Sequence, residues 1–178
     1  NRHLSHLCVG APDVRQYFLT LTEDILERLN PDAVHIESLN FLPFGHGFSN
    51  PKVLTPITPW CSFLMGLCMC GHCIAAASAD GVDGEALRSD VAQYLNTELP
   101  KLPSESEAAK PVTPTRLAAA FGGQLRAFLE VRSGIASSLF EDVVRVIRAH
   151  GDIAVQADHL DQDDELALGL SVERVSPL

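Results

Sequence analysis

Four of the five cysteines in this chain have a spacing that suits a metal ion. The run Cys68-Met69-Cys70-Gly71-His72-Cys73 places three thiols in a C-x-C-x-x-C pattern, and Cys8 stands alone sixty residues upstream. Zn²⁺ takes four ligands in a tetrahedron, often thiolates. Three of them would come from one short segment, and Cys8 is the natural candidate for the fourth. The pattern predicts a structural zinc site, because four thiolates leave no open position for water.

Two alternatives stay open for these residues. His72 could replace one cysteine as a ligand. In addition, Cys70-Gly71-His72-Cys73 is identical to the active-site tetrapeptide of protein disulfide isomerases, in which a thiolate of low pKa at a helix N-terminus drives exchange. That chemistry needs a strand and a tryptophan just before the motif, whereas a helical pattern over 60–67 precedes it here. A thiol–disulfide oxidoreductase is therefore the weaker hypothesis. We expect Cys61 to be a buried core residue.

Composition excludes several classes of function. The chain has 178 residues, 46% of them hydrophobic and 20% charged, which suits one globular core. Its formal net charge of -10 repels phosphate backbones, so we expect no nucleic-acid partner. No apolar stretch reaches about 18 residues, so no membrane span is predicted. An odd number of cysteines concentrated in one motif favours a reducing compartment, here the cytoplasm.

Hydrophobic periodicity predicts mainly helices, with two strands. Helices are expected over 12–29, from Thr58-Pro59 to about 67, from an Asp83 cap to about 99, and over 115–150 with bends or breaks at Gly122-Gly123 and Gly134. The strands are expected over 33–39 and 153–157, and a long loop over 40–59. The first helix is expected to be amphipathic, with an apolar face formed by Val14, Tyr17, Phe18, Leu21, Ile25 and Leu29.

The order of these elements predicts an α/β fold. Strands separated by helices imply parallel pairing with right-handed crossovers. Two strands cannot close a barrel, and the first residue is Asn1 rather than Met. We therefore expect residues 1–178 to be an incomplete part of a larger α/β protein.

The combined motifs resemble a known enzyme family. The chain resembles the zinc-bearing bacterial β-galactosidases of glycoside hydrolase family 42. The matching pieces are Cys8 before the segment 12–17, then Glu37, then Cys68, Cys70 and Cys73. The chain looks still closer to uncharacterised glycosidase-like barrel proteins, which share a His-Gly loop and a Gly-x-Asp helix start, here 45–47 and 81–83. This resemblance implies that residues 1–178 form an incomplete portion of a (β/α)8 barrel. It also implies a glycoside hydrolase acting on a carbohydrate. A non-catalytic sugar-binding or scaffold relative is the alternative, and homo-oligomerisation is left open.

The resemblance assigns roles to particular residues. Glu37 matches the general acid/base at the end of a barrel strand, although the family places Asn before it where this chain has Ile36. In the long loop, His46 could contact a sugar hydroxyl or serve as a metal ligand, and Phe44 could stack on a sugar ring or anchor the loop. Asp158 would lie at the same end of the barrel as Glu37 if the second strand is parallel to the first. Retaining hydrolysis needs a second carboxylate as the nucleophile, which we expect on a later strand outside this chain.

Overall fold

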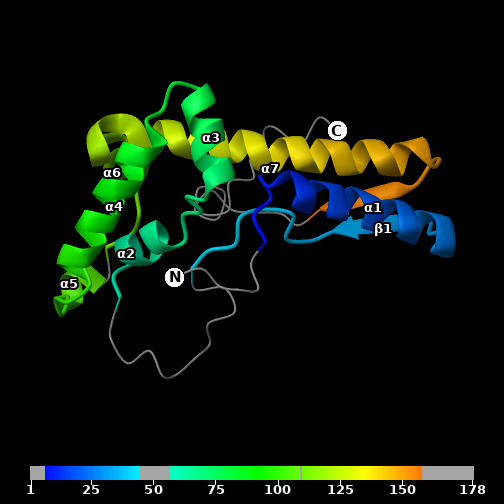
Figure 1. Ribbon diagram of the computed structural model, residues 1–178. Helices are drawn as coiled ribbons and strands as arrows, with labels where there is room; N and C mark the ends of the chain where they lie inside the picture. Colours follow the sequence, from blue (N-terminus) through cyan, green and yellow to red (C-terminus); the bar gives the residue numbers. More distant parts are fainter. Residues whose placement is uncertain (1–6, 45–56, 109, 158–178) are drawn as a thin grey trace. The chain divides into compact units, whose positions relative to one another are not determined.

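The computed structural model describes residues 7–44, 57–108 and 110–157, in two compact units. Unit 1 is discontinuous and comprises Asn1–Phe41 and Arg132–Leu178, whereas unit 2 is the continuous segment Leu42–Val131. Figure 1 shows the elements in the order of the chain. Unit 1 contains α1 (Pro12–Leu29), β1 (Ala33–Ile36), the second part of α7 (Gln124–Ala149) and β2 (Ala154–Ala157). Unit 2 contains α2 (Pro59–Met65), α3 (Gly71–Ala79), α4 (Gly84–Glu98), α5 (Glu105–Ala108), α6 (Pro114–Ala119), η1 (Ala120–Gly123) and the first part of α7.

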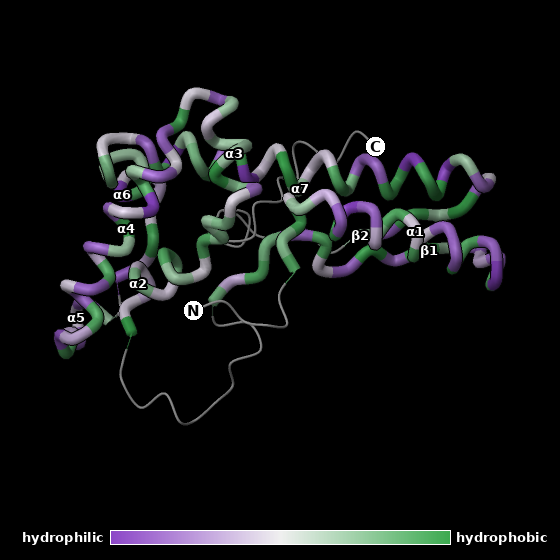
Figure 2. Tube along the Cα trace, viewed as in Figure 1, coloured by the Kyte–Doolittle hydropathy of each residue, from purple (hydrophilic) through white to green (hydrophobic). Residues whose placement is uncertain are grey.

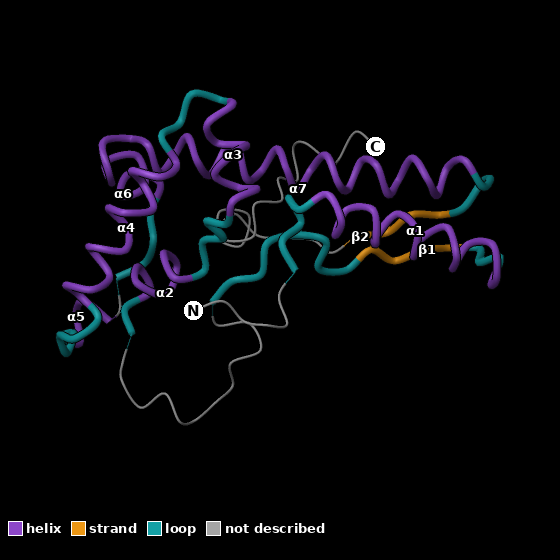
Figure 3. Tube along the Cα trace, viewed as in Figure 1, coloured by secondary structure: helices purple, strands orange, loops and turns teal. Residues whose placement is uncertain are grey.

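The two strands form a parallel pair in unit 1. Ala33 is in register with Ala154 and Ile36 with Ala157, and the Ala154 N–H donates to the Asp32 carbonyl at 3.0 Å. The predicted parallel pairing is thus confirmed. β1 is shorter than the predicted 33–39 because Ser38 has a φ of 58°, which takes the chain out of the extended conformation. Among the described residues the fold is α/β and rich in helix, as Figure 3 shows. The (β/α)8 barrel remains a prediction.

Helix α1 has the predicted bounds but presents a different face to its unit. Pro12 occupies the first turn, and Asn30 ends the helix in the left-handed conformation. Leu26 is buried, whereas four residues of the predicted apolar face are exposed: Tyr17 (55%), Leu21 (39%), Ile25 (38%) and Leu29 (71%). The expected apolar face is thus only partly packed, with Val14 and Phe18 half-buried. The physical reason lies in a polar contact with α7.

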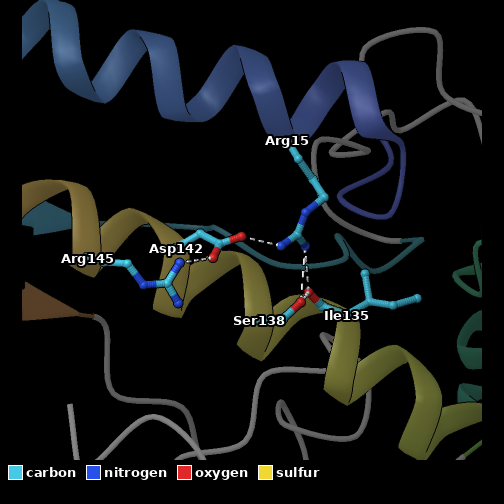
Figure 4. Close-up of polar contacts among 5 residues, drawn as sticks. All are labelled: Arg15, Ile135, Ser138, Asp142 and Arg145. Atoms are coloured by element: carbon cyan, nitrogen blue, oxygen red, sulfur yellow. Dashed lines mark hydrogen bonds and ion pairs between the residues drawn. The ribbon is translucent and has the colours of Figure 1, made fainter.

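Arg15 binds α1 to α7. Its guanidinium donates to the Asp142 carboxylate at 2.6 Å, to the Ser138 hydroxyl at 3.1 Å and to the Ile135 carbonyl at 3.2 Å. Figure 4 shows these contacts, together with Arg145, which donates to the other oxygen of Asp142 at 2.7 Å. With Arg15 turned toward α7, the helix side that carries Thr22 and Leu26 packs inward, and the side with Leu21 and Ile25 faces solvent.

The packed face of α7 supplies much of the core of unit 1. Hydrophobic and hydrophilic residues alternate around this helix, as Figure 2 shows. Five of its residues beyond the unit boundary are fully or nearly fully buried: Ala136, Leu139, Phe140, Val143 and Ile147. α7 continues through Gly134, where a bend or break was expected, because a single glycine costs a long helix only about 1 kcal/mol.

Two of the helices in unit 2, α2 and α4, begin where the sequence predicted, whereas α5 lies in a segment expected to be a surface connection. The Thr58 hydroxyl accepts the Cys61 N–H at 3.2 Å at the start of α2, and the Asp83 carboxylate accepts the Ala86 N–H at 3.0 Å at the start of α4. The predicted break at Gly122-Gly123 is confirmed, since both glycines have positive φ and separate α6 from α7. Within the described residues, no helix is long and apolar enough to cross a membrane.

Candidate metal centre

Three of the predicted metal ligands converge in unit 2. Cys68 and Cys70 lie in the short connection between α2 and α3; Cys70 is the N-cap of α3 and Cys73 lies in its first turn. The sulfur atoms of the three residues all lie within 4.8 Å of one another. The Cys70–Cys73 Sγ–Sγ distance is 3.8 Å. The C-x-C-x-x-C pattern therefore forms the convergent group that its spacing predicts.

The distance between these sulfur atoms fits a tetrahedral zinc ion. Two ligands at a Zn–S distance of about 2.3 Å and a tetrahedral angle are about 3.8 Å apart. Cys70 and Cys73 already have this separation, so neither side chain would have to move far to bind zinc. Cys70 is 4% exposed and Cys73 is 0% exposed, so solvent has little access to either sulfur atom. The expectation of a cysteine cluster compatible with a metal such as zinc is confirmed.

The local backbone holds this segment in place. α2 ends at Gly66, where an added Cβ would lie 2.8 Å from the backbone nitrogen of Phe44, so only glycine allows the two segments to approach. α3 ends in a tight turn in which Gly81 has a φ of 78° and the Val82 N–H donates to the Ala77 carbonyl at 2.9 Å. The approach at Gly66 fixes the start of the connection that carries Cys68 and Cys70, and the turn at Gly81 ends the helix that follows it.

The remaining cysteines and His72 lie in different surroundings. Cys8 belongs to unit 1; it is half-buried, and its carbonyl accepts the Ala11 N–H at 2.9 Å in the turn before α1. Cys61 is buried in α2 and is no member of the cysteine group, as predicted. His72 is exposed in the first turn of α3, outside that group. The structure thus favours cysteine over His72 as a ligand.

The predicted carbohydrate site is described only in part. Glu37 directly follows β1 and is exposed, so it lies at the carboxyl end of a parallel strand as expected. Phe44 is half-buried in the segment after that strand. His46 and Asp158 lie outside the described residues.

Comparisons of the chain with known protein families, with characterised proteins and with solved structures give no match. The likeness to β-galactosidases therefore rests on the motifs themselves and stays a prediction.

Sequence reasoning missed a second group of polar residues in unit 2. A cavity of about 180 Å³ is lined by residues scattered between Ile57 and Arg116, with no motif among them. The only sequence signal is the concentration of lysine and arginine between 101 and 116 in a chain that is otherwise strongly acidic.

Proposed function

We propose that this chain binds one Zn²⁺ through Cys8, Cys68, Cys70 and Cys73, of which the last three have their sulfur atoms within 4.8 Å of one another in unit 2. The observation that carries the proposal is the 3.8 Å separation of the buried Cys70 and Cys73 sulfur atoms, which equals the edge of a zinc–thiolate tetrahedron. A fourth thiolate completes the charge and geometry that Zn²⁺ prefers, and Cys8 supplies it.

The proposed role of zinc is structural. Four thiolates leave no coordination position for water or substrate, so the ion would act on stability rather than on chemistry. Because zinc would bind the folded chain and not the unfolded one, its binding free energy would add to the free energy of unfolding. It would also fix the segment before α1 to a loop sixty residues further along the chain.

Metal content tests this proposal directly. Native mass spectrometry of protein purified without a metal-affinity tag should find one zinc per chain. Cys73→Ser should abolish stoichiometric zinc, because Cys73 is fully buried and its hydroxyl replacement is a poor zinc ligand. Cys61→Ser is the matched control: this cysteine is also buried, at 4% exposure, but lies outside the group, so zinc should be retained.

The role of Cys8 needs a measurement of its own. Replacement of zinc by Co²⁺ should give the absorption typical of tetrahedral thiolate coordination. Cys8→Ser should shift and weaken the sulfur-to-cobalt charge-transfer band, because one thiolate is lost. An unchanged cobalt spectrum in Cys8→Ser would remove Cys8 from the site, and zinc-free wild-type protein with four titratable thiols would refute the proposal as a whole.

Burial argues against the thiol–disulfide oxidoreductase. Exchange requires an accessible thiolate, whereas Cys70 is 4% exposed and Cys73 is 0% exposed. The same burial suits ligands of a structural metal.

Carbohydrate hydrolysis is the second candidate function, and the position of Glu37 favours it. Barrel enzymes place their catalytic residues at the carboxyl ends of parallel strands, and Glu37 follows β1 of a parallel pair. We propose that Glu37 acts as general acid and base within a (β/α)8 barrel. Glu37 is exposed in the described structure, so the substrate or further residues of the barrel would have to cover it.

The test compares variants of two carboxylates, one at each end of β1, in the longest natural form of the protein. Glu37→Gln should lower turnover of alkyl glycosides by about 10²–10⁴-fold and spare aryl glycosides with good leaving groups, which need little protonation. Asp32→Asn, an equally exposed carboxylate before β1, should leave both substrates unaffected. Equal turnover of alkyl glycosides by wild type and Glu37→Gln would refute the assignment.

A further inference from the structure

The cavity of unit 2 combines an apolar wall with an excess of positive charge. It lies where the segment before α2, the C-terminal end of α4, α5 and α6 come together, and contains none of the proposed zinc ligands. Ile57, Leu99 and Leu102 contribute apolar surface. At about 180 Å³ it is smaller than the about 300–1,000 Å³ typical of pockets for drug-sized ligands, so its occupant would have to be small.

Both carboxylates of the cavity already have partners within the chain. Glu98 accepts from the Lys101 ammonium at 2.6 Å, and this hydrogen bond raises the pKa of Lys101. The Glu107 carboxylate accepts from the Ser104 backbone N–H at 3.1 Å and from the Ser104 hydroxyl at 2.9 Å. Glu98 is therefore paired with a cation, and Glu107 is hydrogen-bonded to neutral donors of its own loop.

Two cations of the cavity lack such a partner. Within the described ranges, neither the Lys110 nor the Arg116 side chain forms an ion pair with a carboxylate. The charge of Lys110 lowers the pKa of Glu107, and the Lys110 backbone N–H donates to the Glu107 carbonyl at 3.3 Å. With three basic and two acidic side chains, the cavity carries a net positive charge in a chain whose total is -10. This local excess of positive charge would attract a small anion.

Arg116 is held in place for such a ligand. Its guanidinium carbon lies 4.4 Å above the centre of the Trp60 ring, and Trp60 is only 3% exposed. The Thr113 hydroxyl caps α6 by accepting the Arg116 N–H at 3.2 Å. One face of the guanidinium is thus fixed against an aromatic ring, which leaves its N–H edge to meet a carboxylate in a bidentate manner.

We propose that this cavity binds a small carboxylate with a short apolar body, such as a single ring. Its carboxylate meets Arg116 and Lys110, and its apolar part lies against Leu99 and Leu102. The apolar wall distinguishes this ligand from a bare inorganic anion.

NMR titration of the whole chain tests the site with three probes. Benzoate should move the backbone amide resonances of residues 98–103 and 110–116 with a dissociation constant of about 1 mM, the range expected for a ligand of this size. Benzamide, the neutral analogue, and inorganic phosphate, an anion without an apolar body, should each bind at least about tenfold more weakly.

Variants then assign the anion contact. Arg116→Gln and Lys110→Gln should each weaken benzoate binding at least about fivefold, in proteins whose spectra show them folded. Arg126→Gln is the control, because Arg126 is an exposed arginine of the same unit that pairs with Glu130 away from the cavity. The proposal is overturned by unchanged benzoate affinity in both lining variants, by equal binding of benzamide, or by equal binding of phosphate.

Discussion

Arg15 and Arg145 share the carboxylate of Asp142, and we predict that they contribute very different amounts to the free energy of unfolding. Arg15 is 24% exposed and makes three hydrogen bonds, whereas Arg145 is 73% exposed and makes one. A hydrogen bond to a charged group contributes about 1.5–3 kcal/mol when buried, and an exposed ion pair about 0–1 kcal/mol. With a discount for partial exposure, Arg15→Met should cost about 2 kcal/mol and Arg145→Met less than about 0.5 kcal/mol. Methionine keeps most of the aliphatic stem, so the comparison isolates the polar contacts.

Thermal unfolding and a double-mutant cycle measure this difference. For a chain of this size, about 2 kcal/mol lowers Tm by about 4–8 °C, so Arg15→Met should melt clearly below Arg145→Met. The cycle with Asp142→Ala should give a coupling energy of at least about 1 kcal/mol for Arg15 and less than about 0.5 kcal/mol for Arg145. Equal Tm values for the two arginine variants, or equal couplings to Asp142, would show that Arg15 does not determine how α1 packs on α7.

Three further predictions concern local contacts. Asp83→Ala should destabilise the protein by about 1 kcal/mol in urea unfolding, because the cap on the Ala86 N–H is lost; no change would mean that the cap is not formed in solution. Leu139→Ala should cost about 3 kcal/mol, since its side chain is fully buried, and should leave zinc content unchanged; loss of zinc would contradict a core role confined to unit 1. Hydrogen bonds from the Ser104 backbone N–H and, to a smaller extent, from its hydroxyl lower the pKa of Glu107. The small stabilisation from these bonds is therefore present above the pKa of Glu107 in the unfolded chain and is lost as the pH falls through its pKa in the folded chain. In an NMR titration Ser104→Ala should move the pKa of Glu107 back toward its usual value, and an unmoved pKa would exclude the hydroxyl as a cause.

Local signals predicted the elements well, because they act over a few residues. Pro12 and the Asp83 side chain mark helix starts that the structure confirms, and Gly122-Gly123 marks a real break. The cysteine spacing predicted three convergent thiols for the same reason, since all three lie within six residues. Alternation of helices and strands was sufficient to predict the parallel pair.

Long-range contacts escaped prediction. The hydrophobic pattern selected the side of α1 with Leu21 and Ile25, but Arg15 turns that side to solvent through a partner 127 residues away. No periodicity reports such a contact. The cavity around Arg116 escaped for the same reason, because helices that are distant in sequence form it and its charge balance depends on which acids are already paired.

The discontinuity of unit 1 has a consequence for synthesis on the ribosome. β1 pairs with a strand about 120 residues later, and closing a loop of that length costs about 4 kcal/mol of chain entropy. Unit 2 lies entirely between the two parts of unit 1 and is continuous, so its local helix contacts can form while the chain is still growing. At about 5–20 residues per second, α1 and β1 emerge roughly 5–20 seconds before α7 and β2 exist to pair with them. During that interval the side of α1 that carries Arg15 and Leu26 lacks its partner α7, so α1 is among the last of the described helices to reach its final contacts.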